Sequence, residues 1–408
     1  MKTINENRVE TLGTNRFDKP GAIVAAIVLG FAGTGVAMGL PLLVGSIATS
    51  LHFTDLQLGW LASSDMGGLF LGSVLTSFLV TRINRRYLGA FGLFLVILGN
   101  YASTQSPELI PLMLSRFCAG VGAGLCYATC TASLAGTYHA ARTFSIFLFV
   151  LVAMNAFIFY IFPIIDGKWG VNGLFIFYLL EAIPILFILP LMPKYYDEET
   201  DKVVTINEDS GPDTHLHVPS FLPRLCLTAV FSFYILVGAY WAYVERAGVA
   251  VGISTDFISG ILTWGQVFSL SGTALAAWLA KRYGQSKPLI FALCVMVGTM
   301  LVLAVSIDRT TLAFSIFSFS FFWIFIDVFQ LGVLSNIDHS GHYAALVPAS
   351  QGSAQAVAPT IAGMLLSYQL GYGAVMMLCA AAAAVALIIY LFVYRQLLIL
   401  VPGIADSD

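Results

Sequence analysis

Apolar residues dominate the chain in twelve long runs, and each run is closed by a polar or turn-forming break. A helix that crosses the hydrocarbon core of a bilayer, about 30 Å thick, needs about 20 apolar residues. The pattern therefore predicts an all-α membrane protein with twelve transmembrane helices. The runs cover approximately residues 21–49, 56–80, 87–104, 109–134, 143–165, 171–192, 222–246, 254–280, 287–306, 310–335, 343–368 and 372–395.

The longest break separates the first six runs from the last six. Residues 193–220 are polar and acidic and contain a Gly-Pro pair, which is typical of a solvated linker. We therefore expect a tail at 1–20, a six-helix bundle at 21–192, the linker at 193–220, a second six-helix bundle at 221–396 and a tail at 397–408. The first 20 residues do not resemble a cleaved signal peptide.

The composition suits lipid rather than water. Hydrophobic residues make up 58% of the chain and charged residues 10%, whereas about a quarter of the residues in a soluble domain are charged. The net charge of -3 gives no reason to expect a nucleic-acid partner. The six cysteines lie in apolar runs without metal-ligand spacing, so we interpret them as buried apolar side chains and expect no cofactor or metal.

The distribution of basic residues predicts the orientation. If the N-terminus is cytoplasmic, fifteen Lys and Arg outside the runs lie on the cytoplasmic side and three on the other side. Basic residues are concentrated in cytoplasmic segments of membrane proteins. We therefore expect both termini and the linker to be cytoplasmic, in the inner membrane of a bacterium.

Similar basic turns follow the second run of each half. The first is SFLVTRINRRYLG at 77–89, and the second is AWLAKRYGQSKPL at 277–289. Their placement resembles the signature of the major facilitator superfamily, roughly G-x-L-a-D-R-x-G-R-K. Positions that fit this signature include Arg82, Arg85, Arg86, Arg282 and Gly284.

Both turns depart from the signature at its aspartate, which Thr81 replaces in the first half and Lys281 in the second. In the family that aspartate helps to latch the cytoplasmic gate. The resemblance therefore does not say how the gate of this chain is latched. Asn84 stands at the turn glycine, and asparagine tolerates a positive φ better than most residues. The arginines are also placed to contact helix C-termini or lipid phosphates.

A second resemblance lies in the fourth run. Arg116, Gly120, Gly122 and Gly124 match the R-x-x-x-G-x-G pattern of that helix in the family. Glycines of this kind let two helices approach closely. Together with the two sets of six apolar runs, the resemblance implies the superfamily fold and transport by alternating access.

Charged residues inside the runs are candidates for the transport chemistry, because each costs about 2.5–3.5 kcal/mol at a helix centre. Asp65 lies near the midplane of the second run and Arg116 at a similar depth in the fourth. Asp65 is a candidate for proton coupling, and Arg116 for binding an anionic group of the substrate. A structural ion pair between the two residues is the alternative.

Two further carboxylates lie within or at the ends of runs. Asp327 sits among aromatic residues in the tenth run and is interpreted as a second proton site or a cytoplasmic gate. Glu245 ends the seventh run, next to Arg246, and is interpreted either as part of an interfacial charge pair or as an outer gate or substrate contact. The remaining substrate-binding candidates are polar or aromatic: Asn155, Tyr240, Trp241, Gln266, Gln351 and Gln355.

These observations predict a monomeric secondary transporter for a small organic solute, coupled to protons, and Arg116 favours an anionic solute. Its partners would be that solute, protons and lipids, and it would not be an enzyme. Efflux of drugs or metabolites by proton antiport is the alternative. The fifth run has one proline and no glycine, unlike drug–proton antiporters of the family, which makes efflux the weaker interpretation.

Overall fold

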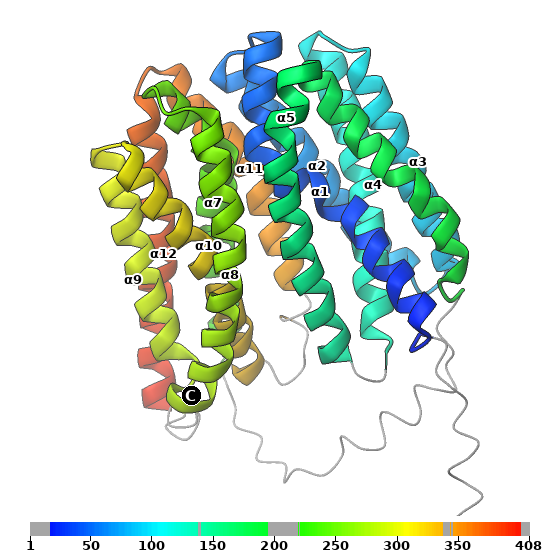
Figure 1. The fold of residues 1–408 in the computed structure, drawn as a ribbon. Coiled ribbons are helices and arrows are strands. Elements are labelled where there is room, and N and C mark those ends of the chain that lie inside the picture. The colour runs from blue at the N-terminus through cyan, green and yellow to red at the C-terminus, as the bar shows by residue number, and fades with distance from the viewer. Residues whose placement is uncertain are drawn as a thin grey trace, which may run out of the picture.

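The computed structural model describes residues 17–137, 140–194, 219, 221–337, 343 and 346–400, and these residues form helices joined by short turns (Figure 1). Most of the two predicted tails and almost all of the 193–220 linker lie outside the described residues. The first half contains α1 (Pro20–Leu51), α2 (Asp55–Leu79), α3 (Arg85–Thr104), α4 (Leu109–Ala135), α5 (Ala140–Ile188) and the short 3-10 helix η1 (Leu189–Leu191). The second half contains α7 (Phe221–Ala250), α8 (Thr255–Tyr283), α9 (Ser286–Val305), α10 (Arg309–Ile337), α11 (Val347–Ser367) and α12 (Gly371–Leu400).

The predicted spans match these helices to within several residues, and α5 carries two of them. Within α5, Gly170 has non-helical backbone angles, with φ at 61°, and divides the helix into two spans. Glycine adopts this left-handed region without the steric cost that a Cβ would bring. The structure therefore has the twelve-span, all-α arrangement that the sequence predicts.

Local sequence signals explain where several helices begin. Thr54 and Gln57 form a capping box at the start of α2, in which each side chain accepts a hydrogen bond from the backbone N–H of the other residue. The predicted eleventh run begins at residue 343, but α11 begins at Val347, with Pro348 in its first turn. Proline suits that position because its missing N–H has no intrahelical partner there.

Asn84 does not adopt the positive φ expected from its place in the family turn. Its φ is -55°, and its side chain accepts a hydrogen bond from the backbone N–H of Arg86 at the start of α3. It therefore acts as a helix N-cap, a role that asparagine fills well. Gly284, at the equivalent turn of the second half, has a φ of 72° and does take the left-handed conformation.

Helix α4 approaches its neighbours through the glycines of the R-x-x-x-G-x-G pattern. A Cβ on Gly120 or Gly124 would collide with the backbone of α2, and one on Gly122 would collide with the backbone of α3. Gly68 of α2 faces α4 in the same way. The predicted role of these glycines in close helix approach is confirmed, and it brings α2 and α4 together where Asp65 and Arg116 lie.

The two faces of the helical assembly differ in charge. We call the face where α1 begins and α2 ends the basic face, since Arg82, Arg85 and Arg86 lie there. We call the other face, where α1 ends and α2 begins, the outer face. Figure 1 shows two bundles that approach each other toward the outer face.

The buried apolar side chains divide in the same way. One cluster joins the outer parts of α1, α2 and α5 to the second half and includes Leu43, Leu58 and Phe159 together with Phe233 and Tyr240. A separate cluster fills the first half near the basic face, around α1, α3 and α4. The halves therefore share a core toward the outer face.

The external surface is suited to lipid. Helix α3 exposes Tyr87, Phe91, Phe94, Leu98 and Tyr101, which recur every three or four residues and so form one stripe. In the described part of the chain, eight helices are long and apolar enough to cross a membrane by length and composition alone. The more polar α2, α8 and α11 do not meet that criterion, and they lie where the two halves meet.

Candidate functional site

The first half contains a buried ion pair between α2 and α4. Arg116 donates hydrogen bonds to Asp65 from Nε (3.0 and 3.1 Å) and from Nη2 (2.8 Å). Its Nη1 donates to Oδ1 of Asn100 on α3, at 2.8 Å, and its guanidinium lies over the ring of Phe175, 5.3 Å from the ring centre. The side chain of Arg116 is fully buried and that of Asp65 is 4% exposed.

This geometry contains the ion pair that was one of the two sequence-based interpretations. The fork of the guanidinium is directed at partners from its own half, through α2 and α3, rather than at the meeting of the two halves. A bidentate Arg–carboxylate pair of this kind fixes side-chain positions strongly. The pair therefore holds three helices of the first bundle together.

The second half carries a carboxylate beside a group of aromatic rings. Asp327 of α10 accepts a hydrogen bond from the hydroxyl of Tyr234 on α7, at 2.6 Å, and Trp323 Nε1 donates to the same hydroxyl at 3.3 Å. Oδ1 of Asp327 is buried and has no hydrogen-bond partner in the described residues. One turn further along α10, the buried amide of Gln330 likewise lacks a partner within the described part of the chain.

The aromatic group extends from this carboxylate to the first half. Trp241 of α7 stacks on Phe319, with 5.5 Å between ring centres, and lies 5.8 Å from Trp323. Its indole donates a hydrogen bond to the carbonyl of Ala37 on α1, at 3.0 Å, and its ring meets Phe159 of α5 edge-on. The predicted substrate residue Trp241 thus lies where the two halves meet.

Toward the outer face, hydrogen bonds join the halves directly. The hydroxyl of Tyr243 donates to the backbone carbonyl of Asp55 (2.6 Å), and that of Tyr372 donates to the Asp55 carboxylate (2.9 Å). The hydroxyls of Ser63 on α2 and Thr360 on α11 lie 2.8 Å apart. We call Asp55, Tyr243 and Tyr372 the outer clasp, because they fix the start of α2 to α7 and α12.

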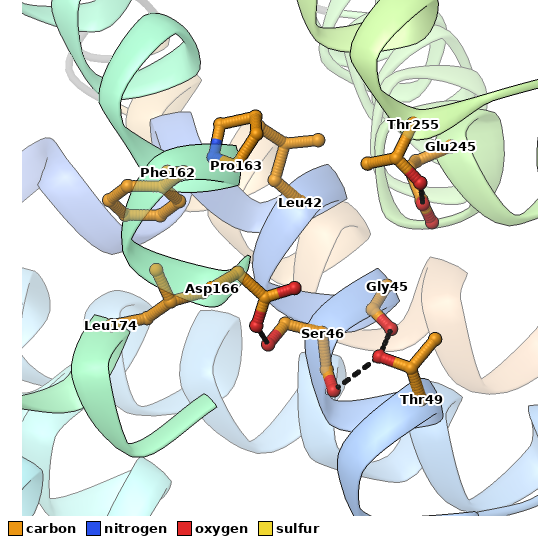
Figure 2. A pocket seen from close by; sticks show the side chains of 10 residues that line it. All are labelled: Leu42, Gly45, Ser46, Thr49, Phe162, Pro163, Asp166, Leu174, Glu245 and Thr255. Carbon is orange, nitrogen blue, oxygen red and sulfur yellow. Dashed lines mark hydrogen bonds between the residues drawn. The ribbon is translucent and has the colours of Figure 1, made fainter. Parts of the chain in front are cut away.

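Two cavities among the described residues are bordered by predicted site residues. One, of about 190 Å³, lies between α1 and α5 and is lined by Asn155, whose Nδ2 contacts the sulfur of Met38 and whose buried Oδ1 has no partner in the described residues. The other, of about 330 Å³ including its opening, lies between α1, α5, α7 and α8 and is lined by Glu245 (Figure 2). Both predicted residues therefore border open space.

The other predicted substrate residues are spread more widely. Tyr240 is fully buried inside the second half, where its hydroxyl lies 2.9 Å from that of Ser315. Gln266 is buried in α8. Gln351 and Gln355 are partly buried, one turn apart on α11.

The basic turn of the first half ties helix ends together within its own bundle. Nη1 of Arg85 donates to the carbonyl of Ala132 near the end of α4, at 3.3 Å, and Nε of Arg86 donates to the carbonyl of Met192. Arg82 is exposed, and Arg282 lies over the ring of Trp278, 5.5 Å from its centre. Arginines at the carbonyl end of a helix interact favourably with its dipole, as one of the two sequence-based interpretations expected.

Sequence reasoning missed several residues that the structure brings to the site. Asn100, Asp55 and Asp166 were not singled out, nor were Tyr234 and Trp323. Asn100 is a polar residue within an apolar run, so polarity at membrane depth was an available signal for it. Asp166 lies between two runs and gave no such signal. The aromatic residues gave none, since rings are common throughout the spans.

Comparisons with known proteins agree with this architecture. Residues 25–346 match the Major Facilitator Superfamily. No curated protein sequence matches the chain.

Solved structures resemble the fold over most of its length. A crystal structure of a mutant form of the nucleoside transporter NupG shares 12% identity, covers 91% of this chain and 99% of its own, and has a TM-score of 0.70. A D-xylose-proton symporter shares 16% identity over 95% of this chain and 98% of its own, with a TM-score of 0.69. A partially occluded, inward-open structure of the xylose transporter XylE from E. coli shares 15% identity, covers 92% of this chain and 98% of its own, and also has a TM-score of 0.69. At such low identity these likenesses concern the fold, and the family match over most of the chain shows that it belongs to the major facilitator superfamily.

Proposed function

We propose that this transporter moves a small organic solute by alternating access, driven by protons, with Asp327 as the coupling carboxylate. The observation that carries the proposal is the position of Asp327, next to aromatic rings that reach across to the first half. A carboxylate at membrane depth is costly unless it binds a proton, an ion or a solute. Tyr234 holds one of its oxygens, which leaves Oδ1 for a proton or a solute group.

Asp65 and Arg116, the first candidates from the sequence, receive a structural role in this proposal. Arg116 already donates to Asp65 and Asn100 and is fully buried, so an anionic solute would have to displace both partners. Because Arg116 is occupied by these two partners, the main reason to expect an anionic solute is gone. A neutral or cationic solute with hydrogen-bond donors suits the Asp327 carboxylate and the flat faces of Trp241 and Trp323 better.

The direction of opening follows from the outer clasp. The concentration of basic residues supports a cytoplasmic basic face, and the hydrogen bonds of the outer clasp support a state closed toward the outside. In this state the clasp and the shared apolar core seal the outer face. Asn155 and the partly buried Gln351 and Gln355 remain proposed solute contacts.

A transport assay tests this proposal. A thermal-shift screen over sugars, nucleosides, amines, amino acids and organic acids would supply a solute, and its flux would be followed in proteoliposomes with and without a pH gradient. We expect the gradient to drive accumulation by the natural chain. Asp327→Asn should abolish gradient-driven accumulation while retaining exchange of solute for solute, since exchange needs no net proton movement.

Asp308→Asn is the matched control, because Asp308 is an exposed carboxylate at the start of α10. It should transport like the natural chain. Accumulation that does not respond to the gradient, or an Asp327→Asn variant that accumulates solute normally, would refute proton coupling through Asp327. The sign of the response distinguishes symport from antiport.

A further inference from the structure

The cavity at the outer face is lined by oxygen atoms from both halves. Asp166, in the middle of α5, accepts a hydrogen bond from the hydroxyl of Ser46 on α1. On the opposite wall, Glu245 of α7 accepts a hydrogen bond of 3.5 Å from the hydroxyl of Thr255 on α8 (Figure 2). The first half thus supplies one carboxylate and the second half supplies another, and both border one cavity of about 330 Å³.

One carboxylate oxygen in this cavity has no protein partner. Glu245 is 3% exposed, and its Oε2 is buried without a hydrogen-bond partner in the described residues. It lies against Gly45 of α1, where a Cβ would collide with the carboxylate. A buried carboxylate oxygen without a partner is expensive when ionised, so such a group takes up a proton, pairs with a positive charge or binds a cation.

The neighbouring charges do not satisfy this oxygen. Arg246 follows Glu245 directly, but its side chain is directed to Asp55 of the outer clasp, with 3.9 Å between Nε and the carboxylate. Lys168 lies two residues after Asp166, and its ammonium is placed over the ring of Trp169. The described lining residues of the cavity include neither lysine nor arginine.

We propose that this cavity binds a monovalent alkali cation, which bridges Asp166 and Glu245 and so holds the outer face closed. Carboxylate and hydroxyl oxygens are suitable ligands for a hard cation. Ca²⁺ takes six to eight oxygens, usually with several carboxylates, whereas Ser46 and Thr255 here leave about one free oxygen on each carboxylate. The volume of about 330 Å³ includes the opening to solvent, and the enclosed part has room for an ion with a few waters.

The location predicts what the ion does. Thr49 and Thr255 are exposed, so the cavity communicates with the outer solution. When the halves separate at this face, the two carboxylates move apart and the bridge is lost. The cation therefore binds preferentially to the outer-closed state and stabilises it. This inference depends on neither the solute nor the coupling ion of the proposed function.

Equilibrium binding of ²²Na⁺ to the purified full-length chain tests the site, at constant ionic strength with choline as the replacing cation. We expect saturable binding of about one ion per chain and a rise in the thermal unfolding temperature with Na⁺ but not with choline. Glu245→Gln and Asp166→Asn keep the shape of each side chain and should weaken Na⁺ binding at least tenfold. Thr255→Val removes the hydroxyl that donates to Glu245 but keeps both carboxylates, and it should weaken Na⁺ binding a few-fold. It therefore tests the site even if a carboxylate variant fails to fold.

Asp308→Asn, an exposed carboxylate variant at the same face, should bind Na⁺ like the natural chain. An absence of saturable Na⁺ binding, an equal response to choline, or unchanged binding in the Glu245, Asp166 and Thr255 variants would each overturn the proposal. Saturable binding of Ca²⁺ without Na⁺ binding would overturn the assignment to a monovalent ion. Loss of proton-driven transport with intact Na⁺ binding would count against the proposed function alone.

Discussion

Removing one partner of the Asp65–Arg116 pair should destabilise the first bundle far more than removing both. In Arg116→Leu, the Asp65 carboxylate loses every hydrogen bond from the guanidinium and stays buried, at 4% exposed. Breaking a buried pair in this way costs about 3–5 kcal/mol, because an uncompensated charge remains. Asp65→Leu leaves the fully buried guanidinium unpaired on one side and should cost a similar amount.

The double variant Asp65→Leu/Arg116→Leu leaves neither charge behind. Replacing a buried ion pair with apolar residues of similar volume is often close to neutral, although Asn100 then loses its bond from Nη1 at a cost of about 1–3 kcal/mol. We therefore expect the double variant to be more stable than either single variant.

Thermal unfolding in detergent, followed by fluorescence, measures these differences. A loss of 3–5 kcal/mol corresponds to about 6–20 °C for a unit of about 150–250 residues. Arg82→Leu is the matched control, since Arg82 is exposed, and it should change stability by less than about 0.5 kcal/mol. If the stability lost in the double variant equals the sum of the losses in the two single variants, the side chains act independently. That result would refute the structural role of the pair.

Two further predictions concern the outer face. Tyr372→Phe removes one hydrogen bond of the outer clasp, and a hydrogen bond to a charged group is worth about 1.5–3 kcal/mol. The ratio of outer-open to outer-closed molecules should therefore rise at least tenfold. Labelling of a cysteine introduced at Ser63 measures this ratio, and unchanged labelling would contradict the role of the clasp. The backbone N–H groups of Thr311 and Thr310 donate to the Asp308 carboxylate and hold its pKa below the usual range. The carboxylate therefore stabilises the start of α10 fully above the unfolded-state pKa, and this stabilisation is lost as the pH falls through the lower folded-state pKa. Hydrogen exchange of those two amides, corrected for intrinsic rates, should show this loss, and Asp308→Asn should lack it.

Hydrophobic patterning was sufficient to predict the helices, because a span needs a fixed length of apolar chain and little else. The role of the α4 glycines was equally predictable, since close backbone approach requires the absence of a Cβ. Charge placement identified Asp65, Arg116 and Asp327 as buried, because a charge in a span is conspicuous whatever it contacts.

The partners of those charges could not be predicted from the chain. Whether Arg116 faces a solute or Asp65 depends on the rotation of α2 against α4, which the sequence does not specify by spacing alone. The outer clasp and the cavity at Glu245 join helices from different halves, so they depend on the state of the transport cycle. Asp166 was overlooked because it lies at a span end, where a charge is ordinarily solvated.

The ion pair between α2 and α4 also has a consequence for how the chain is made. Asp65 precedes Arg116 by 51 residues, and at about 5–20 residues per second a ribosome needs about 3–10 s to add them. During that interval α2, one of the more polar helices, carries a carboxylate without its arginine partner. A lone carboxylate at membrane depth is costly, so we expect α2 to be held in the bilayer more firmly once α4 has been made.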